Sequence, residues 1–455
     1  MSKETRKLSN MWKRPVYAMV EAIVLGERYK PIQKCIRRCL VKYNVIGLDF
    51  DRRASAIVYN VFRNLGLNDR IIEDIAGVNV KKVSPKVRGA LRLITYIYQV
   101  DERSSRDFKR LIRRYTLSYL SGVLKPKELE FYKEIVDKIT KEKWKPTNVN
   151  DEIILIYRIS PNLYNALKKA LEALNEDLDA FLRSTLKPPP HTLRVNRLKA
   201  EPSKIIQELL SLGCNVRLGR YCRNAIIVEG GFHKRLVEMI EKGILIPQDE
   251  ASMIAVELLN PREGMEIADL CAAPGGKTTY LAELSKLKSR IYSFEIFKDR
   301  AKRLMRLLER TGTSSKVKVY VMDAREAVNI LGEESMDLVL IDPPCSSTGA
   351  LAKNPDVRWR YDESAMSEIV KLQADLLEVG WKLLKPNGKM LYTTCSVLPW
   401  ENEYLIKDFM NKHGKAKLIA LSKPFKKSPI LQETMRAWPH IHGVTGFFYA
   451  LIKKP

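Results

Sequence analysis

The feature that most constrains the fold is a regular alternation of strand-like and helix-like segments from about residue 247 to the end of the chain. The strand candidates follow one another at spacings of roughly 20 to 50 residues, a distance that leaves room for a helix between them. They are residues 265–270, 290–295, 317–322, 336–341 and 389–393, with a final pair near 417–421 and 446–452. This alternation predicts an α/β fold with a mostly parallel, doubly wound sheet.

Two segments with other patterns precede residue 247. Residues 1–140 read as all-helical, as in 52–65, where the apolar residues form one stripe at helical spacing. Residues 141–246 start with a linker and helices and continue as strand, helix, strand, helix, strand, which predicts a small α/β platform of the ferredoxin-like or RNA-recognition type. We therefore expect three domains, at residues 1–140, 141–246 and 247–455.

The charge of the chain favours a polyanionic partner. It has 79 Lys and Arg against 53 Asp and Glu, a formal net charge of +26. Nucleic acid is the first candidate for such a surface. A basic stretch in the helical segment predicts phosphate contact, with a solvated charged face as the alternative. Its cations, spaced to share one helix face, are Arg103, Arg106, Lys109, Arg110, Arg113 and Arg114.

Several classes of protein are disfavoured. No apolar run reaches the roughly 18 residues of a membrane span, and residues 1–13 lack the apolar core of a signal peptide. Seven cysteines at irregular spacing argue against a disulfide framework. Cys35 and Cys39 have no suitably placed second pair or His to make a metal site. We expect a cytoplasmic monomer without a metal and without a membrane partner.

A turn of small residues follows the first predicted strand and opens a helix. Paired glycines there let the backbone pass close to a ligand at a helix N-terminus, although the spacing fits neither a dinucleotide motif nor a P-loop. The turn consists of Cys271, Ala272, Ala273, Pro274, Gly275, Gly276 and Lys277. The next three strands end at Glu295, Asp323 and Asp342. Ligands of open α/β sheets bind outside the carboxyl ends of strands, so these features predict one shared ligand site.

Two cysteines are expected at the same edge of the sheet. Cys345 follows Asp342 and two prolines, and Cys395 follows the fifth strand. A thiolate adds readily to an unsaturated carbon and leaves again, so either cysteine suits nucleophilic catalysis. The residues alone do not say which one is the nucleophile, and an apolar packing role is the alternative for both.

These residues lie in longer motifs that resemble those of a known family. CAAPGGKTT at 271–279 and DPPCSSTGAL at 342–351 look like signature motifs of the Fmu/Sun-type RNA cytosine-5 methyltransferases. So do TTCS at 393–396 with ENE at 401–403, PQDEAS at 247–252, PH at 439–440 and GFF at 446–448. The resemblance covers most of residues 190–455, and the helical segment in front is similar to the NusB-like domain of the ribosomal-RNA branch of that family.

The resemblance implies a Rossmann-like methyltransferase domain that uses S-adenosyl-L-methionine to form 5-methylcytidine in RNA. It implies that the 271–277 turn holds the methionine part of the cofactor, Glu295 the ribose and Asp323 the adenine edge, with Arg300 beside the ribose acid. By the same resemblance Asp342 lies at the reacting end and binds the cytosine edge. Cys395 is then the nucleophile that attacks C6, and Cys345 assists product release.

Alternatives remain at this stage. The domain order favours ribosomal RNA, with transfer RNA as the rival substrate. Methylation of a base amino group is a second enzymatic interpretation, although that chemistry usually has an aromatic residue where Cys345 stands. A third is a non-catalytic RNA-binding assembly factor that keeps the methyltransferase fold.

Overall fold

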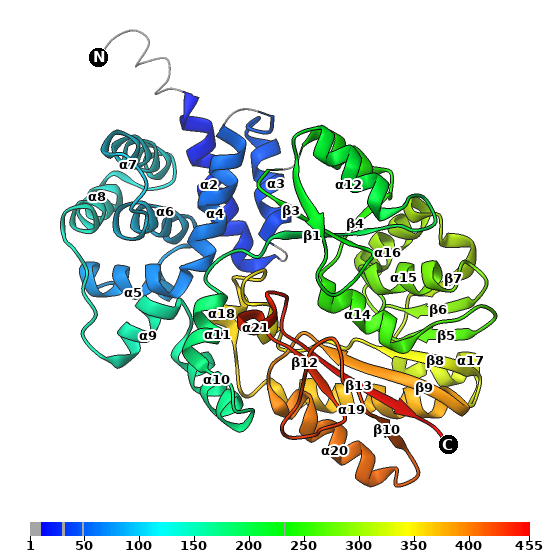
Figure 1. The fold of residues 1–455 in the computed structure, drawn as a ribbon. Helices are drawn as coiled ribbons and strands as arrows, with labels where there is room; N and C mark the ends of the chain where they lie inside the picture. Colours follow the sequence, from blue (N-terminus) through cyan, green and yellow to red (C-terminus); the bar gives the residue numbers. More distant parts are fainter. Residues whose placement is uncertain (1–10, 30–31, 48–49, 232) are drawn as a thin grey trace. The chain divides into compact units, whose positions relative to one another are not determined.

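The computed structural model describes residues 11–29, 32–47, 50–231 and 233–455 (Figure 1). The chain divides into two compact units. Unit 1 contains the residues up to Tyr164 together with Arg358–Tyr361, and unit 2 contains Asn165–Val357 and Asp362–Pro455. The expected lack of a signal-peptide core at residues 1–13 falls mostly on residues 1–10, which lie outside the described part.

Unit 1 is built from helices, so the predicted all-helical segment is confirmed. Buried residues of α4, such as Val58, Val61 and Phe62, lie in one apolar core with residues of α2 such as Val16 and Met19. The helices are α2 (Lys13–Arg28), α3 (Ile32–Lys42), α4 (Phe50–Arg63), α5 (Leu65–Ala76), α6 (Pro85–Thr95), α7 (Arg106–Ser121), α8 (Pro126–Lys141) and α9 (Val149–Tyr157), with the short turns η1 (Val80–Lys82) and η2 (Tyr96–Val100). The amphipathic stripe at 52–65 is thus a core-facing stripe.

The chain enters unit 1 a second time through α18 (Val357–Arg360). The indole of Trp359 donates to the carbonyl oxygens of Phe62 at 3.1 Å and Arg63 at 3.2 Å, and its ring packs against Gly66 so closely that a Cβ there would collide with it. Arg358 is fully buried. A short segment that follows the Cys345 motif is therefore an integral part of the helical core.

The platform of unit 2 is the predicted ferredoxin-like sheet with one strand more than expected. Its elements are β1 (His191–Val195), α12 (Pro202–Ser211), β2 (Asn215–Leu218), β3 (Ala225–Glu229), α13 (Lys234–Glu241) and β4 (Leu245–Pro247). The strands are antiparallel in the order β2-β3-β1-β4. The unpredicted strand β2 lies at the edge and buries only Val216, so its sequence carries little apolar signal.

The larger sheet confirms the predicted α/β fold (Figure 1). Its strands are β5 (Glu266–Asp269), β6 (Arg290–Phe294), β7 (Val317–Tyr320), β8 (Met336–Ile341), β9 (Leu384–Thr394), β10 (Lys417–Ile419), β11 (Lys426–Lys427), β12 (Met435–Ala437) and β13 (Phe447–Lys453). The order is β11-β12-β13-β9-β8-β5-β6-β7, with β10 against β13. The strands from β9 to β7 are parallel, and β13 is antiparallel to β9. Strands β11 and β12 were not predicted, since they are only two and three residues long.

Helices cover both faces of this sheet. Leu338 and Leu340 of β8 lie in a core shared with α14 and α15, whereas Val339 and Ile341 face a core shared with α19 and α20. A parallel strand buried on both faces reads as a continuous apolar run, which is why β8 was easy to predict. The helices of unit 2 are α10 (Pro161–Ala173, which begins in unit 1), α11 (Leu178–Ser184), α14 (Glu250–Leu259), α15 (Gly276–Leu284), α16 (Lys298–Thr311), α17 (Ala327–Leu331), α19 (Met366–Leu383), α20 (Glu403–Lys412) and α21 (Pro439–His442), with the turns η3 (Ser314–Lys316), η4 (Ala324–Glu326), η5 (Thr348–Ala350) and η6 (Pro399–Glu401).

A buried ion pair ties α20 to β12. Arg436 Nε donates to Glu403 Oε1 at 2.5 Å, and the two side chains are 1% and 0% exposed. Ser428 Oγ donates to the same carboxylate at 2.6 Å, and Arg436 Nη1 donates to the carbonyl of Val397 at 3.2 Å. A buried charge is tolerated only when it is paired and hydrogen-bonded in this way.

We predict that Arg436→Met lowers the free energy of unfolding by about 3–5 kcal/mol, because it leaves the Glu403 carboxylate buried without its partner. The matched control is Arg183→Met. Arg183 pairs with Asp179, and the two side chains are 60% and 50% exposed. The control should change stability by about 0.5 kcal/mol or less. Chemical denaturation measures both, and equal effects of the two variants would contradict the assigned role of burial.

Candidate active site

The strand order reverses between β5 and β8, and the predicted site residues gather there. From β5 the chain proceeds to β6 and β7 on one side, while β8 and β9 lie on the other. In open α/β sheets, the crevice at such a reversal, outside the carboxyl ends of the two strands, is where a ligand is expected to bind. The turn 271–277 follows β5, and Asp342 and Cys345 follow β8.

The backbone of the glycine-rich turn is shaped for close approach. Gly275 has φ of 109°, which disfavours other residues, and a Cβ there would lie 2.7 Å from Leu304 Cδ1. Gly275 is the N-cap of α15, and no side chain caps this helix. The first-turn amides of α15 are thus positioned to bind an anionic group such as a carboxylate. Cys271 is half-buried, and burial raises the pKa of its thiol well above the usual value.

Glu295 and Arg300 form a pair beside this turn. Glu295 follows β6, its side chain is 3% exposed, and Oε1 accepts from the amide of Phe297 at 2.9 Å. Arg300 Nη1 lies 3.3 Å from Glu295 Oε2, and Arg300 Nη2 donates to the carbonyl of Ala273 at 2.7 Å. Arg300 therefore connects the acid after β6 to the glycine-rich turn.

Asp323 has partners of its own. Its Oδ1 caps the turn η4 by accepting from the amide of Arg325 at 2.9 Å, and its Oδ2 pairs with Arg325 Nη2 at 2.7 Å. The hydrogen bond from Arg325 lowers the pKa of Asp323, which keeps it ionised. The side chain is 28% exposed, so it stays accessible at the edge of the site.

Lys277 and Asp342 join the two sides of the crevice. Lys277 Nζ donates to Asp342 Oδ2 at 2.5 Å, which links the first turn of α15 to the end of β8. Burial opposes the charge of Lys277, but the Asp342 carboxylate outweighs this effect and raises the pKa of the ammonium. The ammonium of Lys277 is therefore retained although its side chain is only 13% exposed.

The two cysteines of the motifs lie in contact. Cys345 Sγ and Cys395 Sγ are 3.4 Å apart, and Ser347 Oγ lies 3.5 Å from Cys395 Sγ. The hydrogen bond from Cys345 lowers the pKa of the Cys395 thiol, while the same contact and burial raise the pKa of Cys345. The arrangement therefore favours a thiolate at Cys395 with a protonated Cys345 beside it.

Backbone hydrogen bonds connect three of the motifs. The amide of Gly349 donates to the carbonyl of Cys395 at 2.9 Å, and the amide of Gly446 donates to the carbonyl of Gly349 at 3.0 Å. A Cβ on Gly349 would collide with the backbone of Gly446. Glycine at 349 is explained by this close approach of two loops.

Arg194 of β1 is a site residue that the sequence analysis missed. It is fully buried, and Nη1 donates to the carbonyl of Gly276 at 2.6 Å. Its Nη2 donates to Thr279 Oγ1 at 2.8 Å and to Glu283 Oε1 at 3.0 Å. A strand of the platform thus supports the glycine-rich turn. The only sequence signal was a charged residue within a short apolar strand.

The basic stretch of unit 1 lies on and just before α7. Arg103 precedes the helix, so only the other five cations lie on it, which corrects the expectation of one shared helical face. Arg106, Arg110 and Arg114 are exposed, whereas Lys109 and Arg113 are partly buried. The three exposed arginines recur at every fourth residue, and this spacing places them on one side of α7.

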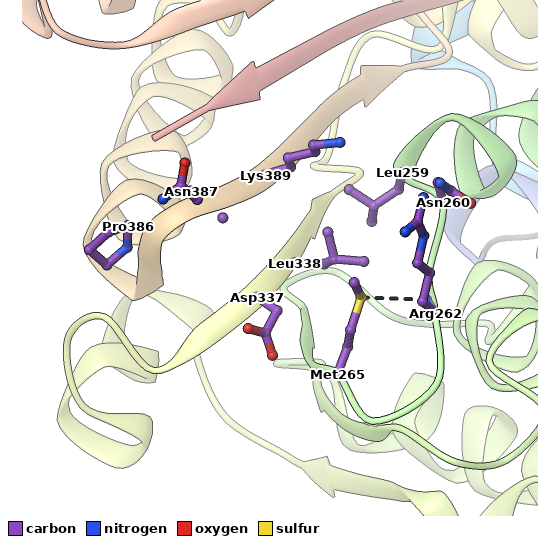
Figure 2. Close-up of a pocket in the computed structure, with 10 residues that line it drawn as sticks. Leu259, Asn260, Arg262, Met265, Asp337, Leu338, Pro386, Asn387 and Lys389 are labelled. Carbon is purple, nitrogen blue, oxygen red and sulfur yellow. Dashed lines mark hydrogen bonds between the residues drawn. The ribbon is translucent and has the colours of Figure 1, made fainter. Parts of the chain in front are cut away.

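The cavity in Figure 2 lies at the opposite edge of the sheet from this site. Met265 precedes β5, and Asp337 lies near the start of β8, so the cavity is at the amino ends of the parallel strands. Arg262 and Lys389 also line it.

Within the described residues, no cluster of three or more His, Cys, Asp or Glu side chains could hold a metal ion. No described helix is both long and apolar enough to span a membrane.

Two family models match the chain. Residues 256–453 match the model described as 16S rRNA methyltransferase RsmB/F, and residues 163–233 match the ferredoxin-like domain of RsmF/B-like methyltransferases. Among solved structures, the crystal structure of PH0851 has a TM-score of 0.89 at 37% identity and covers 97% of this chain and 99% of its own. A methyltransferase homolog protein from Pyrococcus horikoshii has a TM-score of 0.57 at 26% identity and covers 65% of this chain and 100% of its own.

Curated relatives carry the same family description. The ribosomal RNA small subunit methyltransferase B of Photorhabdus laumondii is 32% identical over 63% of this chain and 65% of its own length. The protein of the same name from Yersinia pseudotuberculosis is 34% identical over 58% of this chain and 60% of its own. The chain therefore spans a little under two thirds of the curated relatives it matches. Residues 163–233 and 256–453 therefore resemble the two domains that these models describe for the RsmB/F methyltransferases.

Proposed function

We propose that the protein is an S-adenosyl-L-methionine-dependent RNA cytosine-5 methyltransferase that forms 5-methylcytidine in ribosomal RNA. The observation that carries this proposal is the pair of cysteine sulfurs, 3.4 Å apart, at the carboxyl ends of β8 and β9. Methylation of a base amino group needs no thiolate. Methylation of cytosine at C5 needs a thiolate, because C5 becomes nucleophilic only after a nucleophile has added at C6.

The residues at the crevice fit S-adenosyl-L-methionine. The uncapped first turn of α15 offers amides to the carboxylate of the methionine part. Glu295 accepts hydrogen bonds from the ribose hydroxyls, with Arg300 holding its second oxygen, and Asp323 lies toward the adenine edge. When bound, the cofactor supplies an electrophilic methyl group on its sulfonium.

We assign the remaining steps of the reaction to the two cysteines and Asp342. The Cys395 thiolate adds to cytosine C6 and makes C5 the nucleophile for the methyl group. After methylation the C5 proton passes to solvent, the electrons of the C5–H bond re-form the C5–C6 double bond, and the C6–S bond breaks to return the thiolate of Cys395. Cys345, protonated beside Cys395, assists this release. The Asp342 carboxylate, oriented by Lys277, accepts from the amino group on the cytosine edge.

The RNA is held by parts of the chain other than the catalytic crevice. The net charge of +26 and the exposed arginines of α7 supply attraction to phosphate, and the ferredoxin-like platform is a common RNA-binding surface. The target base leaves its stack to reach the cysteines. We propose residues 1–140 and 141–246 as the RNA-binding domains and 247–455 as the catalytic domain, acting as a monomer in the cytoplasm.

Ribosomal RNA is the proposed substrate because the curated relatives are named for the small subunit. Bisulfite sequencing of total RNA from a strain without this protein tests the choice. Loss of one 5-methylcytidine from small-subunit RNA supports it. Loss of a 5-methylcytidine from transfer RNA alone would show that transfer RNA, and not ribosomal RNA, is the substrate.

We predict that Cys395→Ala abolishes methyl transfer to RNA and leaves cofactor affinity within about twofold, because the nucleophile does not hold the cofactor. Transfer of a labelled methyl group and calorimetric titration with S-adenosyl-L-methionine measure the two quantities. Cys214→Ala, which changes a half-buried cysteine of the platform, is the matched control and keeps full activity. Turnover in Cys395→Ala would exclude this residue as the nucleophile.

Cys345→Ala should instead accumulate a covalent protein–RNA adduct, because attack by Cys395 is retained while release is slowed. The adduct appears as a band that resists denaturant in gel electrophoresis and disappears after digestion with ribonuclease. The double variant Cys345→Ala/Cys395→Ala should show no such band. Normal turnover of Cys345→Ala without an adduct would remove this cysteine from product release.

Replacing Arg106, Arg110 and Arg114 together by Ala should weaken RNA binding and reduce the slope of log affinity against log salt by roughly 0.7–0.9 for each lost phosphate contact. The control replaces Lys127, Lys133 and Lys138 of α8, which stand among Glu128, Glu130, Glu134 and Asp137 and attract phosphate less. Filter binding over a salt series measures both sets. Equal slopes for wild type and the α7 variant would show that α7 does not contact RNA.

A further inference from the structure

The triplet Glu401-Asn402-Glu403 lies deep in the protein, six to eight residues after Cys395. All three side chains are fully buried. Two carboxylates and an amide are costly to bury unless their polar atoms are hydrogen-bonded. Glu403 is satisfied by Arg436 and Ser428 in the ion pair described above. The partners of Glu401 and Asn402 lie in the loops that carry the two cysteines.

Glu401 binds both of these loops at once. Its Oε1 accepts from the backbone amide of Ser346 at 2.8 Å and from Gln373 Nε2 at 3.2 Å. Its Oε2 accepts from Ser346 Oγ at 2.5 Å and from Ser396 Oγ. Ser346 directly follows Cys345, and Ser396 directly follows Cys395. One buried carboxylate therefore spans the positions next to the two sulfurs.

Asn402 fixes the second loop from the same side. Its Nδ2 donates to the carbonyls of Ser396 at 3.0 Å and Leu398 at 2.9 Å, and its Oδ1 accepts from Thr394 Oγ1 at 2.7 Å. The residues on both sides of Cys395 are thus held by one side chain. With the Cys395 loop fixed in this way, the Glu401 carboxylate holds Ser346, the residue next to Cys345, against this loop.

We propose that Glu401 is a positioning residue. It fixes the positions of the Cys345 and Cys395 sulfurs relative to each other for nucleophilic attack and for release of the product. This inference rests on the proposed function for its catalytic meaning, although the geometry it concerns exists in the protein without RNA. Three of the four hydrogen bonds to its carboxylate come from the two loops and the fourth comes from Gln373 of α19, so a change in the carboxylate is expected to alter the distance between the sulfurs.

The same carboxylate makes the two thiols unequal. The contact with Cys395, burial and the negative charge of Glu401 raise the pKa of Cys345, whereas Cys395 faces the ammonium of Lys277 as well as the carboxylate of Asp342. Tyr392 of β9, whose hydroxyl donates to the carbonyl of Glu401 at 2.7 Å, is the other titratable group at this contact. Glu401 thus favours the proton on Cys345.

The test compares Glu401→Gln with Glu176→Gln. Glu176 is also a buried acid of unit 2, but it pairs with His440 and Lys426 and contacts neither cysteine loop. We expect Glu401→Gln to lower kcat for RNA methylation by about ten- to a hundredfold, the effect of misplacing reacting groups by about 1 Å. The KM for RNA should stay unchanged, and the pH profile of kcat should shift as the two thiols become more alike. Glu176→Gln should behave as wild type.

A second measurement needs no RNA and no cofactor. Diamide oxidises two neighbouring thiols to a disulfide and takes up their two protons and two electrons. Because the sulfurs are 3.4 Å apart, wild type and Glu176→Gln should form the 345–395 disulfide rapidly, as followed by peptide mass spectrometry. Glu401→Gln should form it several-fold more slowly. If Glu401→Gln does not fold, Ser346→Ala, which removes one hydroxyl from the carboxylate, should show smaller changes in the same directions.

The outcomes separate this inference from the proposed function. If kcat and the rate of disulfide formation in Glu401→Gln both equal those of Glu176→Gln, the positioning role is overturned. If wild type methylates no RNA but the disulfide rates differ as expected, the positioning role stands and the proposed activity fails.

Discussion

The candidate site depends on the reversal of strand order between β5 and β8, because this reversal places loops that are distant in the sequence beside each other. The turn after β5 and the loop after β8 follow neighbouring strands, so both border the crevice expected at the reversal. The ion pair between Lys277 and Asp342 crosses it. Strand β9, next to β8, adds Cys395 at the same edge. The parallel register thus sets which residues can act on one substrate.

Around this crevice, buried polar contacts determine the position of each loop. Arg194 reaches from the platform to the glycine-rich turn, Arg300 connects that turn to Glu295, and Gly349 lies against Gly446. Each contact joins segments that are far apart in the chain. A buried polar group that loses its hydrogen-bond partner is costly, so these contacts favour one arrangement of the loops over the alternatives.

Much of the fold could be predicted from local sequence patterns. Strands β5, β6 and β8 place apolar residues in the cores on both faces of the sheet and were predicted correctly, and the stripe at 52–65 predicted a helix that ends at Arg63 in the structure. The edge strands β2 and β11 and the three-residue strand β12 were not predicted, because they are short or expose most of their side chains. Arg103 was placed on a helix that begins only at Arg106, since charge spacing carries no signal for a helix start.

The sequence by itself determined the α/β class, the glycine-rich turn, the acids at the strand ends and two cysteines as candidate nucleophiles, because each of these is a local pattern. Only the tertiary structure decided that the two sulfurs lie 3.4 Å apart. It also decided that Glu401 binds the residues next to both cysteines and that Arg194 supports the turn. These relations depend on hydrogen bonds between distant segments, and no periodicity within one segment encodes such a partner.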